Sequence, residues 1–114
     1  MTNKVYNILV VGCGNMGTSH ARAYNRFDGF NIVGLVSRGP ESRKRLSKEL
    51  GGNIPTFSDF ETALKETKPD AVSINTYAST HAQYSIKALE SGAHVFVEKP
   101  LAETVEDAEK VVEA

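Results

Sequence analysis

The 114-residue sequence has one cysteine, no tryptophan and no long hydrophobic run. A single cysteine, Cys13, excludes an internal disulfide and is typical of a reducing compartment. No apolar run approaches the ~18 residues needed to cross a bilayer, and the first residues lack the hydrophobic segment of a signal peptide. We therefore expect a cytoplasmic protein with no membrane partner.

The chain also lacks a large excess of positive or negative charge. The formal net charge is −1, so no global field attracts the chain to nucleic acid or to anionic lipid. Three scattered histidines and one cysteine show no metal-site spacing, and we expect no bound metal. What the chain does have is 40% hydrophobic residues, enough to build the core of one domain of ordinary size.

Strand-like and helix-like segments alternate along the chain. Continuous apolar runs, typical of strands buried on both faces, predict strands over 5–11, 30–36, 71–75 and 94–97, with at most a short strand over 55–57. Helices are expected over 17–26, 40–50, 58–65, 80–91 and from 104 onward. This alternation predicts an α/β doubly wound parallel sheet, the Rossmann architecture, with strand order 3-2-1-4-5.

Three pairs of residues have capping-box spacing and predict where helices begin. In each pair the first residue would cap the helix, and the last helix would carry an apolar face of Val105, Ala108 and Val112. The pairs are Ser58 with Glu61, Thr80 with Gln83, and Thr104 with Asp107.

Three glycines directly follow the first expected strand. Gly12 would permit the turn out of the strand, Gly14 the approach of a pyrophosphate, and Gly17 close packing of the helix on the sheet. The backbone N–H groups of Asn15 and Met16 would then face the phosphates at a helix N-terminus. Because ligands of such sheets bind where the strand order reverses, we favour dinucleotide binding over a merely tight turn of the kind seen in methyltransferase-like folds.

Position 37 bears on the choice of cofactor. The fingerprint expects an acid about 20 residues past the glycines, where it would bind the ribose 2′-hydroxyl of NAD. Ser37 and Arg38 stand there instead, and Arg43 follows one helical turn later. Ser and Arg can bind a 2′-phosphate, so NADP is preferred over NAD. A solvated helix face is the alternative, and we favour it for Lys44 and Lys48.

Three motifs resemble the Gfo/Idh/MocA oxidoreductases, the family of glucose–fructose oxidoreductase and inositol dehydrogenase. They are VFVEKPL over 95–101, the G-x-G-x-x-G-x-x-H pattern over 12–20, and a strand leading to Thr76 with His81 five residues on. The resemblance covers the whole chain. Two departures are the Tyr77-Ala78 pair, where the family often has Pro and Asn, and the missing acid at position 37.

The resemblance implies a role for each matching residue. Glu98 would contact the nicotinamide ribose, Lys99 would stabilise alkoxide character during hydride transfer, and Pro100 would fix the turn that aims Lys99. Without the other motifs, a surface ion pair would be the better interpretation of Glu98 and Lys99. The remaining implied cofactor contacts are Gly12, Gly14, Asn15, Met16 and Gly17 at the pyrophosphate, Ser37 and Arg38 at the adenosine ribose, and Asn75, Thr76 and His81 along the groove.

In the family a larger C-terminal domain supplies most of the substrate pocket and often mediates oligomers. We expect residues 1–114 to form only the dinucleotide-binding domain of a dehydrogenase that acts on a sugar, polyol or related alcohol, inactive without the substrate domain. A homo-oligomer is possible, since an uncovered apolar face favours self-association. The alternative is a stand-alone module that binds NAD(P) without catalysis.

Overall fold

The computed structural model describes residues 5–13, 15–26, 29–76, 78–97 and 105–114, with only the backbone for 15–18, 78–79 and 105–108. Strands and helices alternate without exception over this part of the chain. The strands are β1 (Tyr6–Val11), β2 (Phe30–Val36), β3 (Thr56–Phe57), β4 (Ala71–Ile74) and β5 (His94–Val97). The helices are α1 (Asn15–Arg26), α2 (Pro40–Glu49), α3 (Phe60–Thr67), α4 (Ala78–Glu90) and α5 (Val105–Glu113).

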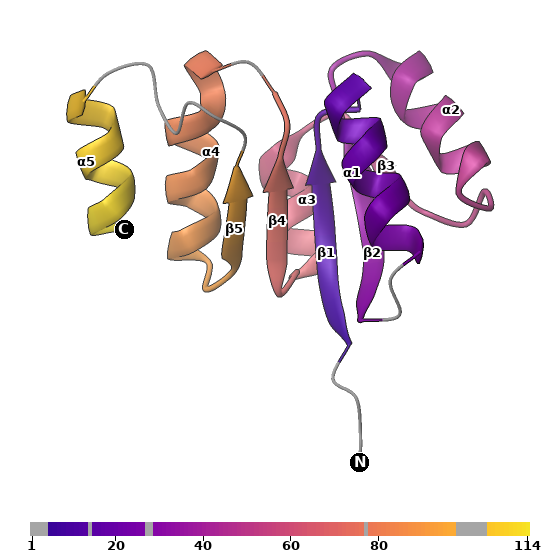
Figure 1. Ribbon diagram of the computed structural model, residues 1–114, viewed down its shortest axis with the longest axis horizontal. Coiled ribbons are helices and arrows are strands. Elements are labelled where there is room, and N and C mark those ends of the chain that lie inside the picture. The colour runs from indigo at the N-terminus through magenta and orange to yellow at the C-terminus, as the bar shows by residue number, and fades with distance from the viewer. Residues whose placement is uncertain (1–4, 14, 27–28, 77, 98–104) are drawn as a thin grey trace.

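The strands form one parallel sheet in the order β3-β2-β1-β4-β5, which confirms the predicted topology. The arrowheads of β1, β4 and β5 in Figure 1 point to the same edge of the sheet, and the parallel pairing of β2 and β3 gives them the same direction. The order reverses between β1 and β4, so the loops after these two strands lie next to each other.

Helices cover both faces of the sheet. In Figure 1 α1 crosses in front of the strands, whereas α3 lies behind them. The α1–α2 face buries Ile8, Val10 and Leu35 together with Ala21 and Leu46 of the two helices. The α3–α4 face buries a second cluster, made of Leu9, Val11, Val36, Phe60, Ala63, Val72, Ile74, Ala88 and Ala93. Alternate residues of β1 therefore serve opposite cores, which explains its continuous apolar sequence.

Three predicted helix starts differ from the structure: α1 begins at Asn15, two residues before the predicted start at residue 17, and two of the predicted caps are wrong. Asp59, not Ser58, caps α3, and its Oδ2 accepts a hydrogen bond from the Thr62 backbone N–H at 3.0 Å. A carboxylate at this position also interacts favourably with the helix dipole, which gives Asp59 the advantage over a neighbouring serine. Thr80 lies inside α4, which begins two residues earlier at Ala78.

The last helix presents a different face from the one predicted. Val111 is buried, whereas Val112 is 79% exposed, so Val112 does not belong to the packed face. The predicted cap Thr104 lies outside the described residues, and the side chains of Val105 and Ala108 are not described. The helix lies beside α4, at the end of the molecule farthest from α2 (Figure 1).

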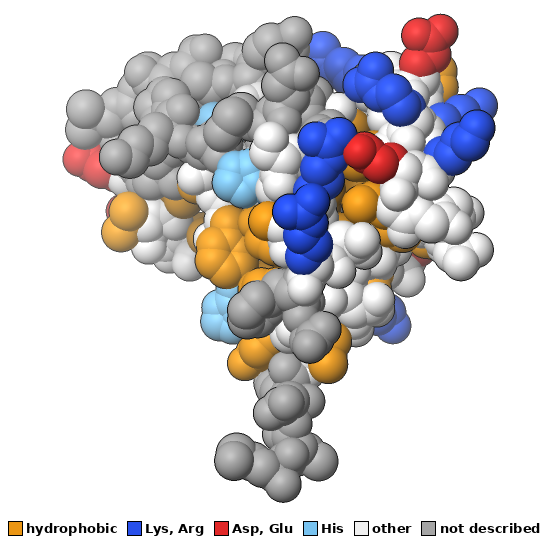
Figure 2. Space-filling view, turned by 45° about the vertical axis from the view of Figure 1, so that its right-hand side comes forward, with side chains coloured by type: hydrophobic (Ala, Val, Ile, Leu, Met, Phe, Trp, Pro, Cys, Tyr) orange, Lys and Arg blue, Asp and Glu red, His pale blue; other side chains and the backbone are white. Residues whose placement is uncertain are grey.

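Basic side chains gather over the α1–α2 side of the surface (Figure 2). The basic residues of these two helices are Arg22 and Arg26 in α1, and Arg43, Lys44, Arg45 and Lys48 in α2.

Among the described residues no helix is long and apolar enough to cross a membrane.

Gly34 marks the tightest packing inside β2. The β1–β2 register shifts between Ile8 and Leu9, so that Leu9 pairs with Gly34. A Cβ on Gly34 would lie 2.9 Å from Leu9 Cδ1 and 3.0 Å from Phe57 Cε2. The glycine thus leaves room for two large side chains on the α3–α4 face.

We predict that Gly34→Ala destabilises the protein by about 1–3 kcal/mol, the typical cost of overpacking a core. Urea unfolding followed by circular dichroism measures the change. Gly39→Ala is the control, because a Cβ there meets only the Ser42 Oγ, at 3.8 Å. Equal stability of Gly34→Ala and the native protein would show that Leu9 and Phe57 rearrange freely.

Candidate dinucleotide site

The turn after β1 is wedged between the two neighbouring strands. The backbone N–H of Gly12 donates to the Val36 carbonyl at 2.7 Å, and that of Asn75 donates to the Val11 carbonyl at 2.8 Å. Gly12 has φ +93°, and a Cβ on it would lie 2.6 Å from the Asn75 carbonyl oxygen. Both the backbone conformation and the space require glycine, as the turn predicted from the sequence does.

The loop after β2 carries the residues assigned to the adenosine ribose. The Ser37 hydroxyl donates to the Gly39 carbonyl at 2.7 Å. Arg43 donates from Nη1 to the Ser37 carbonyl at 2.7 Å, so this guanidinium holds the loop. Arg38 is exposed, and its guanidinium makes no hydrogen bond or ion pair with the described residues. Of the two arginines, Arg38 is the one available to an anionic ligand.

Cys13 lies beneath these two loops. Its side chain is 2% exposed, and Sγ donates a weak hydrogen bond to the Val36 carbonyl at 3.6 Å. Burial raises the pKa of the Cys13 thiol, which the Ser37 hydroxyl and the positive Arg43 only partly oppose. The thiol is therefore neutral at physiological pH, in agreement with a packing role rather than a nucleophilic one.

The loop after β4 is held by side chains of its own segment. Asn75 donates from Nδ2 to the Ser73 Oγ at 3.0 Å, and the hydroxyls of Thr76 and Thr80 share a hydrogen bond of 2.6 Å. His81 is 2% exposed, and its Nε2 lies 2.8 Å from the Thr76 carbonyl oxygen. This buried histidine therefore holds the loop after β4 through the Thr76 carbonyl.

The loops enclose one open cleft of about 790 Å³ at the switch point. Five residues predicted from the sequence line it: Gly12, Ser37, Arg38, Asn75 and Thr76. Arg43 and His81 are not among its lining residues. Asn15, Met16 and Gly17 begin α1, described by backbone alone, whereas Gly14, Glu98, Lys99 and Pro100 lie outside the described residues.

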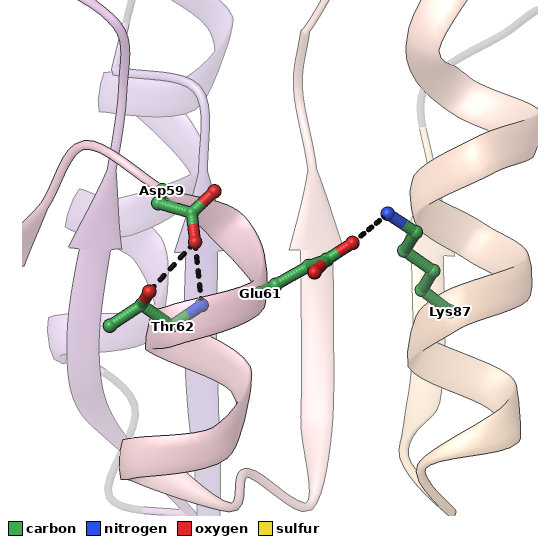
Figure 3. A network of polar contacts seen from close by, with 4 residues as sticks. All are labelled: Asp59, Glu61, Thr62 and Lys87. Carbon is green, nitrogen blue, oxygen red and sulfur yellow. Dashed lines mark hydrogen bonds and ion pairs between the residues drawn. The ribbon is translucent and has the colours of Figure 1, made fainter.

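The far wall of the cleft was not predicted. It is formed by the start of α3 and by one stripe of α4, with Ser58, Asp59, Phe60, Glu61, Thr80, Gln83, Tyr84 and Lys87 lining it. Figure 3 shows Glu61 reaching from α3 toward Lys87 on α4, where the two form an ion pair. The spacing 80, 83, 84 and 87 is that of one helix face, and this spacing beside the switch point is the signal that would have revealed the wall.

The charged side chains Asp59, Glu61 and Lys87 of the far wall all interact with other protein groups. The Thr62 hydroxyl and backbone N–H both donate to Asp59 and lower the pKa of its carboxyl (Figure 3). The ion pair with Glu61 raises the pKa of Lys87. Within the described part of the chain no three His, Cys, Asp or Glu side chains form a group that could hold a metal ion.

This geometry fits a dinucleotide. The volume lies within the ~300–1,000 Å³ typical of small-molecule sites. Gly12, in the turn between β1 and α1, lines the cleft, and so does Arg38 with its available guanidinium. The model of an oxidoreductase family with an NAD-binding Rossmann fold matches residues 6–114. The chain belongs to the Gfo/Idh/MocA oxidoreductase family.

Curated relatives agree with this assignment. An inositol 2-dehydrogenase of Agrobacterium fabrum is 33% identical over 108 residues, which are 94% of this chain and 32% of the relative. Glycosyl hydrolase family 109 protein 2 of Akkermansia muciniphila is 36% identical over 108 residues, 88% of this chain and 23% of the relative. The chain thus spans about a third or less of the relatives' length.

Solved structures show the same fold. The apo scyllo-inositol dehydrogenase of Lactobacillus casei is 32% identical and superimposes with a TM-score of 0.91 over 99% of this chain and 33% of that one. The WlbA dehydrogenase of Bordetella pertussis, solved with NADH and UDP-GlcNAcA, is 28% identical, with a TM-score of 0.86 over 96% of this chain and 34% of that one.

We predict that Gly12→Ala lowers affinity for the dinucleotide at least about tenfold and also lowers stability. A Cβ at this φ is strained and collides with the Asn75 carbonyl, so the turn must move away from β4. Isothermal titration gives the affinity and thermal unfolding the stability. Gly92→Ala is the control, because Gly92 has the same φ of +93° but no atom within 4 Å of a Cβ and does not line the cleft, so it should lower stability without changing affinity. A Gly12→Ala protein with native affinity would show that the turn does not position the cofactor.

Proposed function

We propose that residues 1–114 are the cofactor-binding domain of a dehydrogenase that transfers a hydride between NAD(P) and a sugar, polyol or related alcohol. One observation carries this proposal: the loops after β1, β2 and β4 enclose a single cleft at the switch point. The relatives' length supports a substrate domain elsewhere in the protein. Their names, inositol 2-dehydrogenase and glycosyl hydrolase family 109 protein, support a sugar-like substrate and no finer choice.

We expect different residues to bind different parts of the cofactor. The Gly12 turn and the backbone at Asn15, Met16 and Gly17 bind the pyrophosphate, with Gly14 at the closest approach. Ser37 and Arg38 bind the adenosine ribose, and Asn75 and Thr76 line the groove toward the nicotinamide. Bound NAD(P) supplies the hydride chemistry. Glu98, Lys99 and Pro100 would hold the reacting end, and His81 keeps the Thr76 loop in place.

The alternative function is a stand-alone module that binds NAD(P) without catalysis. A panel of polyols and sugars, tested with the whole protein and both cofactors, separates the two functions. Reduction of the cofactor by any member of the panel supports the dehydrogenase, whereas tight binding without turnover supports the module. Light scattering on the same sample tests whether the protein forms a homo-oligomer, and cell fractionation tests the expected cytoplasmic location.

The loop after β2 supports NADP as the preferred cofactor. No carboxylate stands at position 37 to repel a 2′-phosphate, and Arg38 presents a planar set of donors at the cleft. Arg43 contributes indirectly, since its bond to the Ser37 carbonyl holds the loop in position. A charge-assisted hydrogen bond typically contributes about 1.5–3 kcal/mol, which is about one to two decades of affinity.

We predict tighter binding of NADP than of NAD, and about a 10- to 100-fold loss of NADP affinity in Arg38→Ala. Ser37→Asp should reverse the preference, because a carboxylate binds the ribose hydroxyls and repels the phosphate. Calorimetric titration with both cofactors measures these effects. Lys44→Ala, on the α2 surface, is the control. Equal affinities in the native protein, with NADP binding unchanged in Arg38→Ala, would rule out the phosphate site.

Our prediction for Lys99 concerns turnover in the whole enzyme. Lys99→Ala should reduce kcat about 10²–10³-fold and leave cofactor affinity nearly unchanged, because its charge matters most as negative charge develops on the substrate oxygen. Steady-state kinetics and titration separate the two effects. Native turnover of Lys99→Ala would reassign Lys99 and Glu98 to a surface ion pair.

A further inference from the structure

The cleft extends beyond the residues assigned to the ribose. From Ser37 and Arg38 it continues between the start of α3 and the stripe of α4 that carries Thr80, Gln83, Tyr84 and Lys87. The base of the adenosine half is attached to the ribose that Ser37 and Arg38 are proposed to bind. In this arrangement the base would occupy the part of the cleft beside the far wall.

Three members of the α4 stripe already interact within the protein. The Thr80 hydroxyl shares a hydrogen bond with Thr76, and Lys87 forms an ion pair with Glu61. Tyr84 packs its ring on Phe60, with a centroid distance of 4.7 Å. Gln83 is exposed and makes no hydrogen bond with the described residues, although its side chain lines the cleft.

The other polar side chains of the cleft are poorly suited to recognise a base edge. Ser37, Asn75 and Asp59 each make a hydrogen bond inside the protein. The Arg38 guanidinium contains donors only. Ser42, Ser58 and Tyr84 each offer a single hydroxyl. Among the described residues that line the cleft, Gln83 alone presents an uncommitted donor and an uncommitted acceptor side by side.

We propose that Gln83 recognises the amino edge of the adenine base, which makes it a specificity-determining residue for adenine dinucleotides. The inference rests on the proposed function, since it assumes that the cleft holds NAD(P). Adenine presents an N6 amino donor next to a ring nitrogen acceptor. A glutamine amide pairs with such an edge through two hydrogen bonds, its oxygen accepting from N6–H and its nitrogen donating to the ring.

The placement on α4 suits this role. Gln83 lies one helical turn after Ser79 and Thr80, near the start of α4 and the loop that follows β4. The same helix therefore positions Thr80, which bonds to this loop, and Gln83. The ion pair of Glu61 with Lys87, one turn further along, joins α3 to α4 across the cleft (Figure 3). This contact links the two elements that form the far wall.

Binding of NAD and of 1,N6-etheno-NAD, an analogue in which a bridge blocks N1 and N6 of the base, tests the proposal. The native protein should bind NAD about tenfold more tightly than the analogue, the effect of two neutral hydrogen bonds. In Gln83→Met, which keeps the length of the side chain, this ratio should fall to about one. Gln83→Glu keeps an acceptor for N6–H and should retain part of the ratio.

Glu90→Met provides the matched control, because Glu90 is exposed on the same helix and does not line the cleft. Its ratio should equal that of the native protein. If both dinucleotides bind but Gln83→Met keeps the native ratio, the role of Gln83 is refuted and the proposed function stands. If the folded native protein binds neither dinucleotide, the proposed function and the role of Gln83 fall together.

Discussion

The site depends on the close approach of two backbone segments, the turn at Gly12 and the carbonyl of Asn75. Because position 12 has no side chain, β1 and β4 end side by side, and the loops that leave them meet at one point of the sheet edge. Hydrogen bonds from Gly12 to Val36 and from Asn75 to Val11 fix this meeting point on both sides. The loops after β1, β2 and β4, which line the cleft, all start at this point of the sheet edge. A larger residue would separate the strands where the cleft needs them closest.

The second constraint is the way polar groups around the cleft are already paired. Arg43, Asn75 and His81 hold loops, Asp59 caps α3, and Glu61 binds Lys87. Most of them are hydrogen bonds, and the one ion pair named here, between Glu61 and Lys87, is exposed, where a single ion pair contributes little to stability. Their effect is geometric, because they keep the walls in place while the cleft is open. Arg38 and Gln83 line the cleft without a side-chain hydrogen bond to the described residues, and we propose that they recognise the ligand.

The topology could be predicted because period and composition agree along the whole chain. Apolar strands such as 71–74, each followed by an amphipathic helix, leave little choice but a parallel sheet with helices on both faces. The helix starts were harder, because Ser58 and Asp59 are both good caps and only the structure shows which side chain reaches the Thr62 N–H. In α5 the side of the helix facing α4 decides between Val111 and Val112, and that packing is tertiary. The far wall of the cleft was missed for a related reason: Gln83 and Lys87 look like ordinary surface residues until α3 is placed opposite them.

The roles of Arg38 and Arg43 show where sequence reasoning about charge reaches its limit. Both arginines follow β2, and the sequence predicts that Arg38 contacts the 2′-phosphate and that Arg43, one helical turn later, completes the site. The fold separates them: Arg43 turns back to the Ser37 carbonyl, whereas Arg38 extends toward the cleft. An arginine that holds its own loop contributes to affinity by positioning its neighbour, and its loss would weaken binding of NAD and NADP alike. An arginine at the phosphate discriminates between them. If NADP is the preferred cofactor, as we propose, the preference depends on which guanidinium the β2–α2 loop leaves unpaired, and the number of basic residues after the strand does not determine it.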